Sequence, residues 1–118
     1  MFELYGRTIR LSRGDTGIIP FRIDGVKLEA EDRAVFTVKA RSGQIILQKV
    51  LAPKDESLFY MPFVNDETDD MKPGIYEWDL RVVLGAQVNS KGMVTDGREV
   101  ITPWPPAKFE VVKVVGEV

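Results

Sequence analysis

Glu77 and Asp79 are the two residues whose types and spacing come nearest to a catalytic pair. They stand two positions apart in the run 76–83, where apolar and charged residues alternate almost without error. Residues two apart on a strand share one face, and two carboxylates at a suitable separation can hydrolyse a glycosidic bond. Arg81 continues that face. We therefore interpret the three charges as a ladder that keeps a strand soluble and in register.

Histidine and cysteine are absent from the whole chain. Without histidine there is no Ser-His-Asp triad, and the commonest general base and transition-metal ligand are missing. Without cysteine there are no disulfides, thiolate metal sites or cysteine nucleophiles. An enzyme would depend on carboxylates, lysine or serine, and none stands in a recognisable arrangement. We therefore expect no catalytic residue, no cofactor and no bound metal.

The acidic run that contains Asp66, Glu67, Asp69 and Asp70 could present several oxygens to a hard cation such as calcium. It lacks the Asp-x-Asp-x-Asp-Gly order and the terminal glutamate of an EF-hand loop. Acidic side chains also favour the positive end of a short helix. We expect a solvated helix N-terminus or a solvated loop here.

Arg13-Gly14-Asp15 spells the tripeptide that integrins recognise. Recognition would require an exposed, flexible loop in a secreted protein. A tight turn explains the same residues, because Gly14 permits a positive φ and Asp15 can bond nearby backbone before the strand that follows. We expect the turn.

Trp78 and Trp104 could serve as sugar-stacking platforms, with Tyr60 or Tyr76 assisting. Trp78 alternates with core positions, so we expect it in the core. Trp104 lies in Pro103-Trp104-Pro105-Pro106, and such a segment cannot lie deep in a regular strand. It is either a lid over a sheet edge or an exposed contact. Trp104, Pro103 and Pro105 are therefore candidate partner-binding residues, together with Pro20.

Composition favours one globular domain over residues 1–118, with 44% hydrophobic and 29% charged residues. The net charge of −2 gives no concentrated basic face for nucleic acid or an anionic membrane. The N-terminus lacks a basic region followed by an apolar run, and no segment approaches the ~18–20 apolar residues of a membrane span. The absence of cysteine fits synthesis in a reducing cytosol, and we expect no membrane or nucleic-acid partner.

Short apolar runs separated by turn residues predict an all-β chain. Their number is typical of an immunoglobulin-like antiparallel β-sandwich of seven to eight strands. Pro20 places its strand at a sheet edge or a bulge, because proline has no N–H to donate. The run 44–51 is apolar on both sides, which predicts cover by the sandwich and by a neighbour or partner. The expected strands span residues 8–11, 16–23, 34–40, 44–51, 58–64, 76–83 and 109–115, with a brief pairing at 100–102.

Several short motifs carry a resemblance to a known family. A Gly-Asp-Thr turn at 14–16 leads into a strand, a Pro-Gly-x-Tyr-x-x-Asp-Leu strand begins at Pro73, and Phe-x-Val-Val closes the chain at 109–112. Phe-Thr-Val-Lys at 36–39 and Thr-Pro at 102–103 lie between them. In this order the chain resembles small phage and prophage structural proteins of Gram-positive bacteria, similar to the N-terminal immunoglobulin-like domain of siphophage upper baseplate proteins.

The resemblance implies a non-enzymatic structural or assembly domain in a virion or prophage particle, in its tail, baseplate or neck region. It also implies synthesis in the bacterial cytoplasm. The partners of such a domain would be other structural subunits or further copies of itself, so we expect a homo-oligomer. The alternative from another class is a carbohydrate-binding module that uses exposed aromatic residues such as Trp104.

Overall fold

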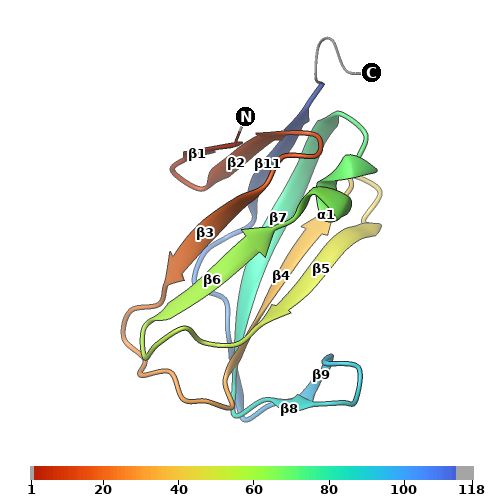
Figure 1. The fold of residues 1–118 in the computed structure, drawn as a ribbon. Helices are drawn as coiled ribbons and strands as arrows, with labels where there is room; N and C mark the ends of the chain where they lie inside the picture. The colour runs from red at the N-terminus through yellow and green to blue at the C-terminus, as the bar shows by residue number, and fades with distance from the viewer. Residues whose placement is uncertain (1, 114–118) are drawn as a thin grey trace.

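The computed structural model describes residues 2–113, except for the side chains of residues 3, 5 and 65. Strands dominate this part of the chain, and one short helix interrupts them (Figure 1). The elements are β1 Phe2–Tyr5, β2 Thr8–Ser12, β3 Gly17–Arg22, β4 Arg33–Lys39, β5 Ile45–Leu51, β6 Leu58–Phe63, α1 Asn65–Asp69, β7 Gly74–Leu84, β8 Gln87–Val88, β9 Val94–Asp96, β10 Glu99–Ile101 and β11 Ala107–Val112.

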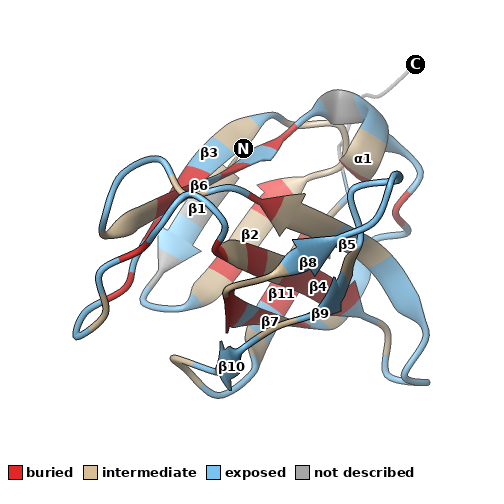
Figure 2. Ribbon diagram, turned by 90° about the horizontal axis from the view of Figure 1, so that it is seen from below, coloured by how far each residue is buried: buried red, intermediate tan, exposed pale blue. Residues whose placement is uncertain are grey.

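The strands form a two-layer sandwich. The larger sheet has the order β1-β2-β11-β7-β4-β5, with β10 paired to the far end of β7. The second layer is the antiparallel pair β3–β6, which lies across one face of the larger sheet (Figure 1). A separate hairpin, β8–β9, projects from one end and is largely exposed (Figure 2). Pairing of β3 with β6 on one side, and of β4, β7 and β11 on the other, is the arrangement of an immunoglobulin-like sandwich.

The predicted immunoglobulin-like sandwich is thus confirmed, with two differences in detail. The described residues contain eleven strands, because β1, β8 and β9 add to the seven predicted strands and to the predicted brief pairing at 100–102, which forms β10. In addition, β2 and β11 pair in parallel, and no local sequence pattern predicts this pairing. The last predicted strand, 109–115, runs past Lys113 into residues outside the described part of the chain.

The core forms between the two layers because inward and outward residues alternate along each strand. On β7 the predicted face of Trp78, Leu80 and Val82 is buried, while Arg81 is exposed. Aromatic rings dominate the contact between the layers, where each such side chain removes roughly 150–250 Å² from water. The ring pairs that cross between layers are Phe21–Phe36, Phe21–Trp78, Phe36–Phe63 and Phe63–Phe109, with centroids 5.5–6.0 Å apart.

Tyr76 supplies a second mark of this architecture. Its hydroxyl donates to the Lys72 carbonyl at 2.6 Å, and its ring meets Phe109 edge-on at 6.4 Å. A tyrosine near the start of this strand, bonded to backbone a few residues upstream, is the tyrosine corner of immunoglobulin-like sandwiches. Within residues 2–113, no helix has the length and apolar character needed to cross a membrane.

Candidate binding site

Trp104 is half-buried beside the second layer of the sandwich. Its ring packs on Phe21 of β3, with centroids 5.8 Å apart and an interplanar angle of 40°. The prolines around it keep the backbone of this segment out of regular pairing, so the indole reaches the sandwich from the side. The two sequence-based alternatives therefore combine, because Trp104 covers the edge of the core and leaves part of its ring accessible.

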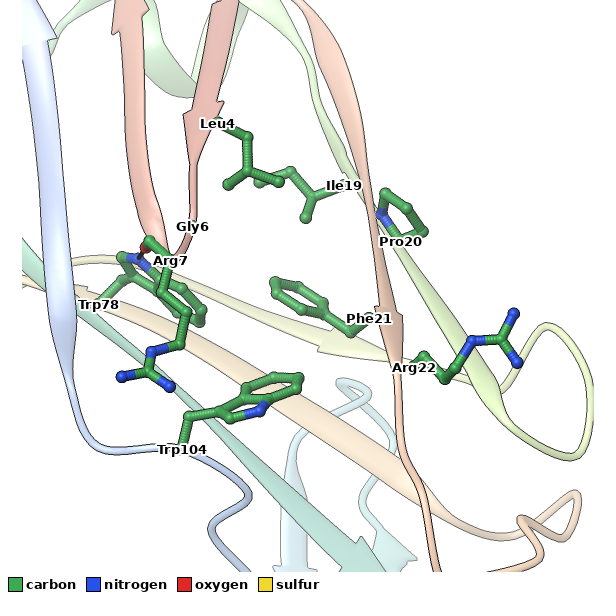
Figure 3. Close-up of a pocket in the computed structure, with 9 residues that line it drawn as sticks. All are labelled: Leu4, Gly6, Arg7, Ile19, Pro20, Phe21, Arg22, Trp78 and Trp104. Atoms are coloured by element: carbon green, nitrogen blue, oxygen red, sulfur yellow. Dashed lines mark hydrogen bonds between the residues drawn. The ribbon is translucent and has the colours of Figure 1, made fainter.

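A pocket of about 210 Å³ opens next to this ring (Figure 3). Its floor consists of the buried side chains of Ile19, Phe21 and Trp78. Phe21 holds the floor together, because it also contacts Trp78 at 5.5 Å between ring centroids. We call this site the Trp104 pocket; its lining comprises Leu4, Gly6, Arg7, Ile19, Pro20, Phe21, Arg22, Trp78 and Trp104.

The hairpin of β1 and β2 forms one wall of the Trp104 pocket. Tyr5 pairs with Thr8, which leaves Gly6 and Arg7 as a two-residue loop. Gly6 has a φ of 59°, as the first position of a type II′ turn requires. The indole Nε1 of Trp78 donates to the Arg7 carbonyl at 2.8 Å. The buried floor therefore fixes the position of the turn that joins β1 to β2.

Two arginines give the pocket its charge. The side chain of Arg7 reaches toward the Trp104 ring, whereas Arg22 lies at the opposite rim and points away from the floor (Figure 3). None of the nine lining residues is acidic. Both guanidinium groups are planar donors that match carboxylates and stack on aromatic faces. The pocket therefore offers an aromatic surface for an apolar group and cationic donors for an anionic neighbour.

The size of the pocket limits its ligand. Sites for drug-sized molecules usually enclose about 300–1,000 Å³, and about 210 Å³ suits one side chain or a similarly small group. Leu4 extends this apolar surface outward, since its side chain is 47% exposed. A segment of a larger molecule would fit this arrangement better than a free cofactor.

The predicted partner-binding residues divide into two groups. Trp104 and Pro20 line the pocket, whereas Pro103 and Pro105 do not. Pro103 is half-buried and Pro105 is exposed, so both shape the segment that carries Trp104. Sequence reasoning missed Leu4, Arg7 and Arg22; the one available signal was Gly6, whose turn potential pointed to a hairpin at the N-terminus.

The two carboxylates singled out above border different hollows. Asp79 borders a hollow of about 270 Å³ on the outer face of the larger sheet, and Glu77 borders a different hollow of about 360 Å³. Joint action on one bond requires both groups in one cleft. The outward alternation of both residues is that of the predicted ladder.

Of the two expected alternatives, the acidic run forms the short helix, α1. Glu67 is committed to structural contacts, because its Oε1 accepts the Val64 N–H at 2.9 Å and its Oε2 lies 2.8 Å from Lys49 Nζ. Within residues 2–113 there is no group of three or more acidic side chains arranged to hold a metal ion.

The Arg-Gly-Asp tripeptide forms the predicted turn. Gly14 has a φ of 85°, and the Asp15 N–H donates to the Ser12 carbonyl at 3.0 Å. The fully buried Thr68 holds the turn from α1, accepting the Gly14 N–H with its hydroxyl oxygen at 3.0 Å. The tripeptide is thus a partly buried part of the fold.

Comparison of this chain with protein-family models, with curated proteins and with solved structures found no match. Functional inference therefore depends on the chemistry of the site.

Proposed function

We propose that this protein is a non-enzymatic interaction domain that holds a segment of a partner protein in the Trp104 pocket and serves in the assembly of a phage or prophage particle. The observation that carries the binding role is the pocket itself, with three aromatic rings and two arginines among its lining residues. The role in a virion or prophage particle is supported by the resemblance of the Gly-Asp-Thr turn and the Pro73–Arg81 run.

Chemical complementarity defines the partner segment. An apolar or aromatic side chain would lie on Phe21 and against Trp104, where apolar surface of both the peptide and the pocket is removed from water. An aspartate or glutamate next to it would pair with Arg7 at the rim. Trp and Arg are the residues most often found as energetic centres of protein interfaces, and the rigid floor lowers the ordering cost of binding.

A carbohydrate-binding module is the second candidate, because part of the Trp104 ring is accessible for stacking. Sugar recognition also needs acceptors for hydroxyl groups. The charged side chains of the lining, Arg7 and Arg22, are donors alone. This chemistry favours an acidic peptide over a neutral glycan.

The test uses uniformly ¹⁵N-labelled protein and two sets of short peptides. One set carries phenylalanine or tryptophan flanked by aspartate and glutamate, and the matched set carries lysine in place of the acids. The chain has two tryptophans. The Trp78 indole N–H signal therefore reports on the floor of the pocket, and the Trp104 signal reports on the ring beside its opening. We expect the acidic set to shift the Trp104 signal and the lysine set to leave it in place.

Variants locate the contact. Trp104→Ala should weaken peptide binding by at least about thirtyfold, the effect of losing an energetic centre worth about 2 kcal/mol. Arg7→Glu should abolish the preference for acidic peptides, because it reverses the charge at the rim. The turn should persist, since the backbone carbonyl of residue 7 still accepts the Trp78 N–H. Tyr60→Ala, an exposed aromatic outside the pocket, is the control and should bind as the native chain does.

Four results would overturn the proposal. Absence of any peptide shift, or binding that survives Trp104→Ala, removes the pocket as a peptide site. Binding to a glycan array that disappears in Trp104→Ala identifies a carbohydrate module. Gene neighbourhood tests the proposed role in a phage or prophage particle. Tail, capsid or portal genes beside this gene support that role, and polysaccharide-degradation genes contradict it.

A further inference from the structure

The edges of the β3–β6 layer are closed to further strands. The Ile23 N–H donates to the Ser57 carbonyl at 2.8 Å, and the same register continues along the pair. Since backbone groups alternate in direction along a strand, the amide positions of Pro20 on β3 and Pro62 on β6 face outward. Neither proline has an N–H, and proline at such positions discourages edge pairing.

The edge of β6 is also occupied by its own chain. The Lys54 N–H donates to the Leu58 carbonyl at 2.7 Å, and the Lys49 ammonium donates to the Pro62 carbonyl. A further strand could not reach these groups without displacing the segment that covers them.

The edge of β5 is different. It lies at the border of the larger sheet (Figure 1), and within the described residues it pairs with β4 alone. The seven residues of β5 include no proline. Ile45 and Ile46 are 50% and 37% exposed, which leaves apolar side chains beside unpaired backbone groups. The opposite border, β1, has four residues and offers a shorter ladder.

The charge on β5 is already compensated. Lys49 points toward α1, and its Nζ lies 2.8 Å from the Glu67 carboxylate. On the outer face, Gln48 donates from Nε2 to the Thr37 hydroxyl at 3.1 Å. No unpaired charge on β5 therefore repels an approaching strand, whereas natural edges are commonly protected by charged residues.

We propose that the β5 edge binds a second copy of this chain, so that two larger sheets join into one continuous sheet across a two-fold axis. Antiparallel pairing of identical strands brings paired side chains to the same face, which restricts the axis to a residue position. With the axis at Gln48, the two Gln48 side chains meet and Leu47 lies opposite Lys49. The β4–β5 register shifts at Ile46, so regular pairing is centred on these residues. With the axis at Lys49, two lysines would be adjacent, and like charges directly opposite are destabilising.

A charge exchange at the axis tests this geometry. Gln48 is exposed, so Gln48→Lys and Gln48→Glu should both fold, which circular dichroism can verify. In sedimentation experiments over a concentration series, the native chain should dimerise. Each variant alone should have its dimer dissociation constant raised at least tenfold. A one-to-one mixture of the two variants should recover the dimer, because opposite charges then meet at the axis.

Crosslinking gives an independent readout, because the chain has no cysteine of its own. Residues opposite each other in antiparallel strands have Cα atoms about 4.5–5.5 Å apart, within the range that a disulfide spans. Gln48→Cys should form a covalent dimer on mild oxidation. The control is Ile18→Cys, at a 62% exposed position on β3, which should stay monomeric under the same conditions.

The outcomes separate this proposal from the Trp104 pocket. A native chain that is monomeric at all concentrations overturns it, as does a dimer that both Gln48 charge variants leave unchanged. Equal crosslinking of Ile18→Cys and Gln48→Cys also overturns it. Trp104→Ala should dimerise as the native chain does, so failure of the peptide-binding proposal leaves this one standing.

Discussion

The ion pair between Lys49 and Glu67 allows a quantitative test of what stabilises the sandwich at the border where β5 lies. The pair joins β5 to α1, and its side chains are 18% and 20% exposed. We expect Lys49→Met and Glu67→Gln to be coupled in stability. These substitutions keep the aliphatic stem of residue 49 and an oxygen at residue 67 that can still accept the Val64 N–H.

The magnitude follows from distance and burial. At 2.8 Å and an effective dielectric constant of about 20, the attraction is about 6 kcal/mol before desolvation. Removal of both charges from water offsets most of this, so a coupling energy of about 1.5–2.5 kcal/mol should remain. The pair Lys27–Glu56 is the matched control, because it is 3.9 Å apart and its side chains are 75% and 71% exposed. Its expected coupling is about 0–0.5 kcal/mol.

The assay is urea unfolding of the native chain, the single variants and the double variant of each pair. One low protein concentration is used throughout, so that association does not enter the comparison. Added salt at about 0.5 M should reduce the exposed coupling more than the partly buried one.

Equal coupling energies for the two pairs would refute the reasoning. A coupling below about 0.5 kcal/mol for Lys49 and Glu67 would do the same, because burial would then have no effect on the attraction. Such a result would also remove the argument that the charge of β5 is compensated within its own chain.

Two further predictions concern the frame of the fold. Tyr76→Phe keeps the ring on Phe109 but loses the hydrogen bond to Lys72, so urea unfolding should show a loss of about 1–2 kcal/mol; Tyr60→Phe at an exposed position should change stability by less than about 0.5 kcal/mol, and equal losses would contradict the tyrosine corner. The Ser57 N–H that donates to Asp55 holds the pKa of that carboxyl below its ordinary value of 3.8. Since the folded value is the lower one, the stabilisation is complete above pH 3.8 and is lost as the pH falls through the folded pKa. Carboxyl NMR titration of Asp55 checks this, and a value at or above 3.8 would contradict it.

Local patterns predicted most of the strands. β7 was predicted from alternation over residues 76–83, and the structure extends it to Gly74–Leu84. β3, β4, β5 and β6 agree with their predicted ranges to within one residue at each end. Alternation and turn glycines act between near neighbours in the chain, so they are visible without the fold.

Short strands were harder to predict. β1 has four residues, too few for a clear alternation, and it pairs because Gly6 turns the chain back onto β2. Asp32 carries a charged side chain, yet it is 1% exposed, and its Oδ1 accepts the Gly85 N–H at 2.8 Å. Its burial depends on a loop that lies far away in the sequence.

The sequence by itself determined the all-β class, the inward face of Trp78 and the exclusion of histidine and cysteine chemistry, because these follow from composition and short-range alternation. Only the tertiary structure decided that Trp104 meets Phe21, that Arg7 borders their pocket, and that β5 forms an open edge. These features depend on which strands become neighbours. That choice is made by the packing of two layers, which no single segment encodes.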